Sequence, residues 1–212
     1  MSIFKALGET PVGQALIAFW HDLPFWFLLG ALLALALLPA LYFWQQGAVA
    51  LAVLLTCPAA FVLSGIARAF AQTVAERPPR WDAFRGQHLR AGLSVWCALA
   101  LVALTFAHPA PAPIFWLQCG VAAFLLLLAP LVLCGSALLG TPPLASWRNG
   151  LVMAVHRPQV AVGLVALAVL LAWAAFGENV LLSLLVPGLW ISIAVYSTSS
   201  LLQQFHDVSN GA

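Results

Sequence analysis

Six long apolar runs dominate the chain and leave few choices for its fold. They lie at residues 24–44, 47–70, 91–107, 113–136, 159–176 and 179–203. A helix needs about 20 residues to cross the roughly 30 Å hydrocarbon core of a bilayer, and these runs are of that order. The sequence therefore predicts an all-α fold, a polytopic transmembrane helical bundle of about six spanning helices, with residues 1–212 forming a single membrane domain.

The composition excludes other broad classes. Of the 212 residues, 64% are hydrophobic and only 7% are charged, against about a quarter charged in soluble domains. The runs are continuous and rich in Leu and Ala, unlike the alternating segments of a membrane β-barrel. The net charge of +2 is small and scattered, so we exclude nucleic acid as the main partner. The stretch before Pro24 lacks the pattern of a signal peptide, and we expect none to be removed.

The basic residues predict the orientation of the bundle. All eight fall before the first run, at the connection between the second and third runs, or between the fourth and fifth: Lys5; Arg68, Arg77, Arg80, Arg85 and Arg90; Arg148 and Arg157. Short connections that carry Lys and Arg stay on the cytoplasmic side during insertion. We therefore expect both termini and both arginine-bearing connections to be cytoplasmic.

Each arginine-bearing connection contains a segment led by tryptophan, which predicts two short cytoplasmic interfacial helices. From Leu144 onwards, a helical wheel puts Trp147, Leu151, Ala154 and Val155 on one arc, with Ser146, Asn149, His156 and Arg157 opposite. Such a helix lies in the headgroup region with its apolar face down. The segment 81–90 shows the same pattern more loosely. We expect five residues to act as interfacial anchors or partner contacts: Trp81, Arg85, Trp147, Arg148 and Arg157.

The four cysteines and five histidines form no pattern typical of catalysis or metal binding. Cys57, Cys97, Cys119 and Cys134 lie in apolar runs without a C-x-x-C spacing, so we interpret them as small core residues. The histidines are spread over termini and connections; the pairs His21–Asp22 and His206–Asp207 are most simply exposed pairs. We expect no catalytic residue, no metal, no cofactor and no enzymatic activity.

The last run contains the richest polar stretch within a span. Candidate residues for a solute path are Pro187, Gly188, Tyr196, Ser197 and Thr198. The alternative is that these hydroxyl groups bond back to their own helix or join neighbouring helices. Prolines at 39, 58, 130 and 187 predict kinks, and a broken helix at Pro187–Gly188 is the one hint of a substrate site.

Ionisable residues are nearly absent from the centres of the runs. Arg68 lies about one turn from the end of its helix and is expected to extend to the headgroups, while Glu178 lies at the opposite face. Coupled transporters place ionisable groups near the bilayer midplane. We therefore expect that this chain does not move a charged solute by itself.

A weak internal repeat is visible in the two halves of the chain. Each copy has a spanning helix with a proline, Pro58 or Pro130, followed by a serine and a glycine and then an interfacial segment. Phe84 and Arg85 in the first copy correspond to Trp147 and Arg148 in the second. The spacings differ, so the repeat suggests a duplication without establishing one.

Several short motifs resemble the YesL-like family of bacterial membrane proteins of unknown function. They are Phe4–Leu7, Cys57–Ala60, Trp81–Arg85, Leu144–Arg148 and Val155–Pro158. The resemblance spans nearly the whole chain, although Cys57 stands where the family commonly has glycine. It implies a multi-pass protein of the bacterial inner membrane, often associated with carbohydrate uptake, and supplies no catalytic residues.

Together these observations predict an accessory or regulatory role. The expected partners are the lipid bilayer and another membrane protein, for which a carbohydrate transporter is the candidate, or a second copy of the chain. The alternative is a small permease for a neutral solute such as a sugar.

Overall fold

The fold is entirely helical in the part of the chain that the computed structural model describes, which is residues 10–106, 111–178 and 180–210. Side chains are described for these residues except 172, 174–178, 180–183 and 205–210. The elements are α2 (Pro11–His21), α3 (Leu23–Gln45), α4 (Val49–Leu55), α5 (Cys57–Val74), the 3-10 turn η1 (Trp81–Phe84), α6 (Gln87–Phe106), α7 (Ala112–Leu139), α8 (Pro143–His156), α9 (Pro158–Glu178) and α10 (Val180–Asn210). The predicted all-α class is confirmed.

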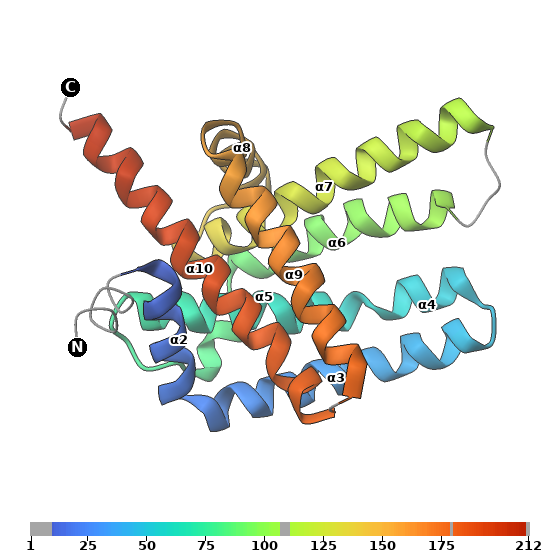
Figure 1. Cartoon of the computed structure of the whole chain (residues 1–212), viewed down its shortest axis with the longest axis horizontal. Helices are drawn as coiled ribbons and strands as arrows, with labels where there is room; N and C mark the ends of the chain where they lie inside the picture. The colour runs from blue at the N-terminus through green and yellow to red at the C-terminus, as the bar shows by residue number, and fades with distance from the viewer. Residues whose placement is uncertain (1–9, 107–110, 179, 211–212) are drawn as a thin grey trace.

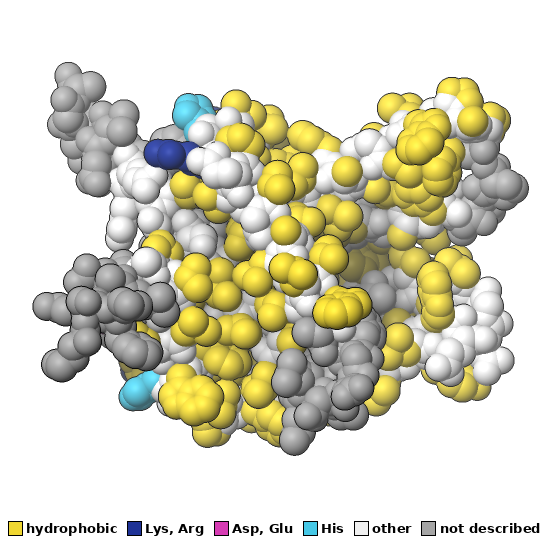
Figure 2. Space-filling view, viewed as in Figure 1, with side chains coloured by type: hydrophobic (Ala, Val, Ile, Leu, Met, Phe, Trp, Pro, Cys, Tyr) yellow, Lys and Arg dark blue, Asp and Glu magenta, His cyan; other side chains and the backbone are white. Residues whose placement is uncertain are grey.

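The protein is a multi-pass membrane protein by the length and hydropathy of its helices. Five segments are long and apolar enough to cross a bilayer: α3, α4 with α5, α6, α7 and residues 184–204 of α10. The pair α8–α9 passes the same test only when it is counted as one span, and its two helices are bent by 102°. Figure 2 shows apolar side chains spread widely over the face in view, with Arg and His side chains only toward the left, as lipid contact requires.

Two helical pairs form arms that point to the right in Figure 1, one of α3 and α4 and one of α6 and the first half of α7. Helices α9 and α10 lie side by side to the left of these arms, in front of α5. Helix α10 contacts α2, α3, α5, α7 and α9, so it is the centre of the bundle. The largest buried cluster joins α5, the second half of α7 and α10 at the left, and we refer to this part as the arginine end.

Small residues set the closest approaches between helices. A Cβ atom on Gly30 of α3 would lie 1.8 Å from the backbone oxygen of Leu184 on α10. A Cβ atom on Gly92 of α6 would lie 1.7 Å from Ser64 Oγ on α5. Close backbone approach through small residues is the usual way in which transmembrane helices gain packing energy. These two glycines therefore fix the spacing of α3 against α10 and of α6 against α5.

The second span is broken, and the break differs from the expected one. Helix α4 ends at Leu55 and α5 begins at Cys57, because Pro58 cannot donate to the carbonyl one turn before it. Thr56 stabilises the break: its hydroxyl donates to the carbonyl of Val53 and accepts from the Trp96 indole at 2.8 Å. Helix α10, in contrast, continues through Pro187, so the predicted break at Pro187–Gly188 is wrong.

A short N-terminal helix, α2, precedes the first span. Thr10 caps it by accepting the Gly13 N–H at 3.1 Å, and Pro11 takes the first helical position. Asp22 precedes α3, and its carboxylate contacts the His21 ring at 3.3 Å and makes no capping hydrogen bond to the helix. The side chains of α2 that face the bundle pack on α10. The sequence analysis did not identify this helix.

Arg68 makes a contact that the sequence did not predict. Its guanidinium donates to the carbonyl of Ala137, near the C-terminus of α7. A cation at this position satisfies a terminal carbonyl and interacts favourably with the helix dipole. Helix α7 then stops at Gly140, whose φ of 64° is the left-handed conformation that often ends a helix. Arg68 therefore joins α5 to the end of α7.

Candidate functional site

The five predicted anchor residues all belong to the arginine end, but they lie in different environments. Trp81, Arg85, Arg148 and Arg157 are exposed, whereas Trp147 is half-buried. Trp81 contacts Phe25 of α3 edge to face, with ring centroids 5.8 Å apart. The structure therefore keeps four of the five available to lipid or to a partner, and uses the fifth for packing.

The connection around Trp81 folds back on α5 and is a fixed part of the bundle. The Phe84 ring covers Gly65, where a Cβ atom would lie 2.3 Å from it. Gln72 of α5 donates to the Asp82 carboxylate at 2.8 Å and accepts the Arg80 N–H at 2.9 Å. Within the predicted segment 81–90, Trp81–Phe84 forms a single 3-10 turn. Residues 87–90 already belong to α6, so the segment does not form an interfacial α-helix of its own.

His88 is the most enclosed ionisable side chain of this connection. It is 3% exposed, and its Nε2 lies 2.7 Å from the Ala83 carbonyl. It belongs to the first turn of α6 instead of an interfacial face. His88 therefore serves to close the loop that carries Trp81 and Arg85.

Helix α8 is the clearer interfacial element. It meets α9 at 102°, so it runs nearly parallel to the membrane surface when α9 spans the bilayer. Leu144, Leu151 and Val155 are exposed, and Leu144 reaches 85%. Part of the predicted apolar arc is therefore not covered by the protein. Trp147, in contrast, turns inward, and its indole donates to Ser94 Oγ of α6 at 2.9 Å.

The inward side of α8 corrects the predicted polar face. Ser146 is 2% exposed and shares hydrogen bonds with Thr141 and Pro142. Gly150 lies against Val132, and Met153 packs over Gly135 of α7. The helix begins at Pro143, with Pro142 at the N-cap position. The buried side of α8 is decided by the contacts of Gly150 and Met153 with α7. A helical wheel contains no information on such contacts.

The two halves of the weak repeat share a packing motif. In each, a glycine on a spanning helix is covered by a large side chain from the next connection: Gly65 by Phe84, and Gly135 by Met153. The position of Phe84 thus corresponds to that of Met153, whereas Trp147 packs against Leu128 and Val132.

The candidate solute-path residues of α10 do not share one wall. Gly188 is buried against Phe19 and Trp26, and Thr198 is buried and donates to the Ala194 carbonyl at 2.7 Å. Tyr196 faces a groove beside α2 and the end of α5. Ser197 faces another groove, which also contains Arg157. The structure brings Ser197 and Arg157 together and separates Ser197 from Tyr196.

Two grooves stand out among those lined by described residues. The α7–α8 groove has a volume of about 700 Å³ and is almost wholly apolar; its lining is Phe124, Leu125, Leu128, Leu144, Ala145, Trp147, Arg148 and Leu151. The α2–α9–α10 groove, of about 360 Å³, combines Arg157, glutamines and serines with an apolar floor. The sequence analysis found some of these residues but neither groove, since each depends on how distant helices meet.

The cysteines and the other ionisable residues give no reactive cluster in the described part of the chain. Cys134 is buried, Cys57 and Cys119 are half-buried and Cys97 is exposed, so Cys97 is not the core residue we expected. In residues 10–106, 111–178 and 180–210, no group of His, Cys, Asp and Glu side chains is placed to hold a metal ion. The side chains of Glu178, His206 and Asp207, and residues Lys5 and His108, lie outside the described part.

Comparison of the sequence and the structure with protein-family models, with curated proteins and with solved structures gives no match.

Proposed function

We propose that the protein resides in the bacterial inner membrane with its arginine end in the cytoplasm. Arg157 lies beside the start of α2 and the last third of α10. The end of α5, which leads to Arg77 and Arg80, borders the same two helices. The elements that carry Arg77, Arg80 and Arg157 thus meet at one end of the bundle, as the positive-inside rule requires of a cytoplasmic face. The resemblance to the YesL-like family supports the choice of membrane.

Within that membrane, we propose an accessory or regulatory role through contact with another membrane protein, with a carbohydrate transporter as the candidate. The α7–α8 groove carries this proposal. It presents exposed Leu144, Leu151 and Phe124 beside the Trp147 ring, with Arg148 at its edge. An apolar helix of a partner fits such a surface, and the arginine offers a counter-charge for an acidic residue at the helix end.

The accessory role is better supported than the permease. A neutral solute needs polar groups along one continuous path through the bilayer. Ser64, Ser136, Ser192 and Thr198 donate to carbonyls of their own helices, and Tyr196 and Ser197 line separate grooves. The four hydroxyl groups are therefore bonded within their own helices, and the other two side chains do not share one path. For this reason the permease is the second hypothesis.

Site-specific photo-crosslinking in native membranes tests the accessory role. A photoreactive residue is placed at Leu144 or Leu151, with Leu35 and Leu101 as matched positions that are also exposed but lie on the arms. We expect one discrete larger species from positions 144 and 151 only, containing a transporter subunit identified by mass spectrometry. A species of twice the chain mass would indicate self-association instead. Crosslinks to lipid alone at all four positions would contradict the proposal.

A further inference from the structure

The α2–α9–α10 groove has the chemical layout of a lipid site. It lies where the start of α2, the first turns of α9 and the last third of α10 meet, and its volume is about 360 Å³. Its lining divides into a polar rim and an apolar floor. The rim consists of Arg157, Gln159, Ser197, Ser200 and Gln204; the floor includes Val160, Leu164, Leu167, Ile193 and Leu201.

The polar rim is not used by the fold. Ser192 and Thr198, on the same helix, donate to carbonyls one turn earlier. Ser197 and Ser200 make no such bond among the described residues, and both line the groove. The Arg157 guanidinium is exposed and has no hydrogen-bond or ion-pair partner within the described part of the chain. The rim therefore offers one cation, two amides and two hydroxyl groups to an external ligand.

The apolar floor continues from the rim along α9 and α10. Leu164, Ile193 and Leu201 are buried beneath it. Gly163 lies in the lining, and a Cβ atom there would have nothing within 4 Å. The glycine keeps this part of the groove open, so that a chain-like apolar group can lie along it.

The groove lies at the level where lipid headgroups are expected. Figure 2 shows the Lys and Arg atoms of this face at the upper left, beside the junction of α8 and α9, with apolar side chains below them. Val12, Leu16 and Trp20 form an exposed apolar face of α2 at the same end. Such a helix lies in the interface between headgroups and acyl chains.

We propose that this groove binds a phospholipid with an anionic headgroup from the cytoplasmic leaflet. The phosphate contacts Arg157, whose planar guanidinium matches a phosphate in a bidentate manner. The glutamines and serines of the rim bind the headgroup hydroxyl and ester oxygens. One acyl chain lies over Gly163 between α9 and α10. Free phosphate would leave the apolar floor uncovered, and for this reason we commit to a lipid. The inference rests on the orientation proposed above but is independent of the partner on α8.

Ligand selectivity of the full-length protein tests the site without any mutation. The purified chain in mild detergent is titrated with short-chain phosphatidylglycerol, with phosphatidylcholine of the same chain length, or with inorganic phosphate. Thermal unfolding and native mass spectrometry are recorded. We expect phosphatidylglycerol to bind about tenfold more tightly than phosphatidylcholine, and phosphate alone to leave the melting temperature unchanged. Equal effects of the two lipids, or stabilisation by phosphate alone, would overturn the proposal.

Two variants locate the site. Arg157→Gln should weaken phosphatidylglycerol binding about tenfold, and Gly163→Leu should block it by filling the floor. The matched controls are Arg85→Gln, also exposed, and Gly120→Leu, where a Cβ atom likewise meets nothing within 4 Å. Lipid selectivity that survives both site variants would place the bound lipid elsewhere and overturn the assignment. Because Leu144 and Leu151 are outside this groove, the crosslinking result on α8 is obtained separately.

Discussion

The arginine end and the two arms of the bundle differ in what covers their apolar side chains. At the arginine end, α5, α7 and α10 bury one another, and small residues let these helices approach closely. Hydroxyl groups and Arg68 donate hydrogen bonds to backbone carbonyls there. The arms expose large apolar side chains such as Leu35, Leu38 and Leu101. Lipid covers these side chains as well as protein would, because it is equally apolar. Stability should therefore depend on packing at the arginine end and on the bilayer in the arms.

The largest expected effect comes from Gly30→Leu. The added side chain would meet the Leu184 backbone, which cannot move aside as a side chain could. We expect a loss of more than about 3 kcal/mol of unfolding free energy, or no folded protein. Gly120→Leu, on an arm with open space around it, should be neutral. The measurement is reversible unfolding in mixed micelles; equal effects of the two changes would show that the close approach of α3 to α10 does not contribute to stability.

The second largest difference in unfolding free energy between the two regions is expected when a leucine is shortened to alanine. Leu131→Ala, at a position that is 0% exposed, should cost about 3 kcal/mol because it leaves a cavity. Leu101→Ala, at a position that is 66% exposed on an arm, should cost less than about 0.5 kcal/mol because detergent or lipid fills the space. If Leu101→Ala is as costly as Leu131→Ala, the arms are packed against protein.

Arg68→Ala should lower the unfolding free energy by about 2 kcal/mol, because the terminal carbonyl of α7 loses a charged donor. Arg85→Ala is the control, since Arg85 is an exposed arginine of the same end, and should change the value by less than about 0.5 kcal/mol. Hydrogen exchange at the last turn of α7 should rise in the first variant only. Unchanged exchange there would contradict the capping role.

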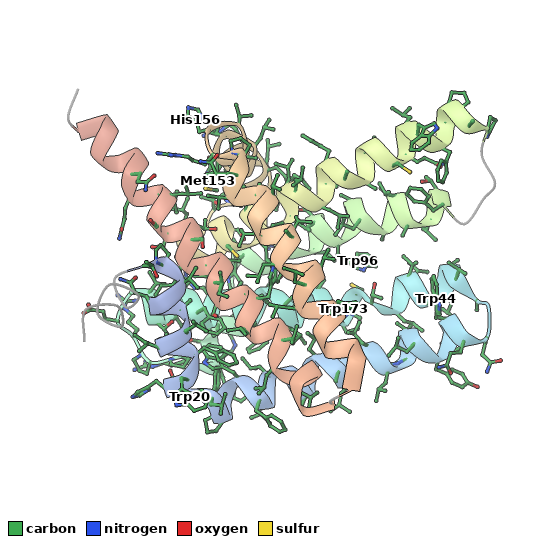
Figure 3. The ribbon with its side chains drawn as sticks, in the orientation of Figure 1. Trp20, Trp44, Trp96, Met153, His156 and Trp173 are labelled. Atoms are coloured by element: carbon green, nitrogen blue, oxygen red, sulfur yellow. The ribbon has the colours of Figure 1, made fainter. Side chains whose placement is uncertain are left out.

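The smallest expected effect is at the broken span. Figure 3 shows Trp96 between the two arms, where its indole donates to Thr56. Trp96→Phe keeps the ring but removes the donor and should cost about 1 kcal/mol. Trp116→Phe, at an exposed position of α7, should cost less. A cost for Trp116→Phe equal to that for Trp96→Phe would mean that the hydrogen bond contributes nothing to the arms.

The spans could be predicted from the sequence because hydropathy over 20 residues is a local property. Most boundaries in the structure lie within a few residues of the predicted runs, as with 113–136 and α7. The grouping of the arginines in two connections could also be recognised from the sequence. Helix α2 carried a signal that was missed: Thr10 followed by Pro11 is typical of a helix start.

The remaining features depend on contacts between distant residues. The inward turn of Ser146 follows from Gly150 lying against Val132, and Arg68 finds its carbonyl on another helix. Ser197 and Thr198 are adjacent in sequence, yet one faces a groove and the other is buried. Composition and periodicity contain no information on which neighbour each side chain meets.

Reporter fusions test the central claim, six crossings with the arginine end in the cytoplasm, most directly. Fusions are made after Gln46, after Arg157 and at Ala212, each to alkaline phosphatase and to green fluorescent protein. The account predicts phosphatase activity only after Gln46, and fluorescence after Arg157 and at Ala212, because two further crossings by α9 and α10 return the chain to the cytoplasm. Phosphatase activity after Arg157 would contradict the orientation, and activity at Ala212 in addition to that after Gln46 would show that α9 and α10 do not both cross the membrane.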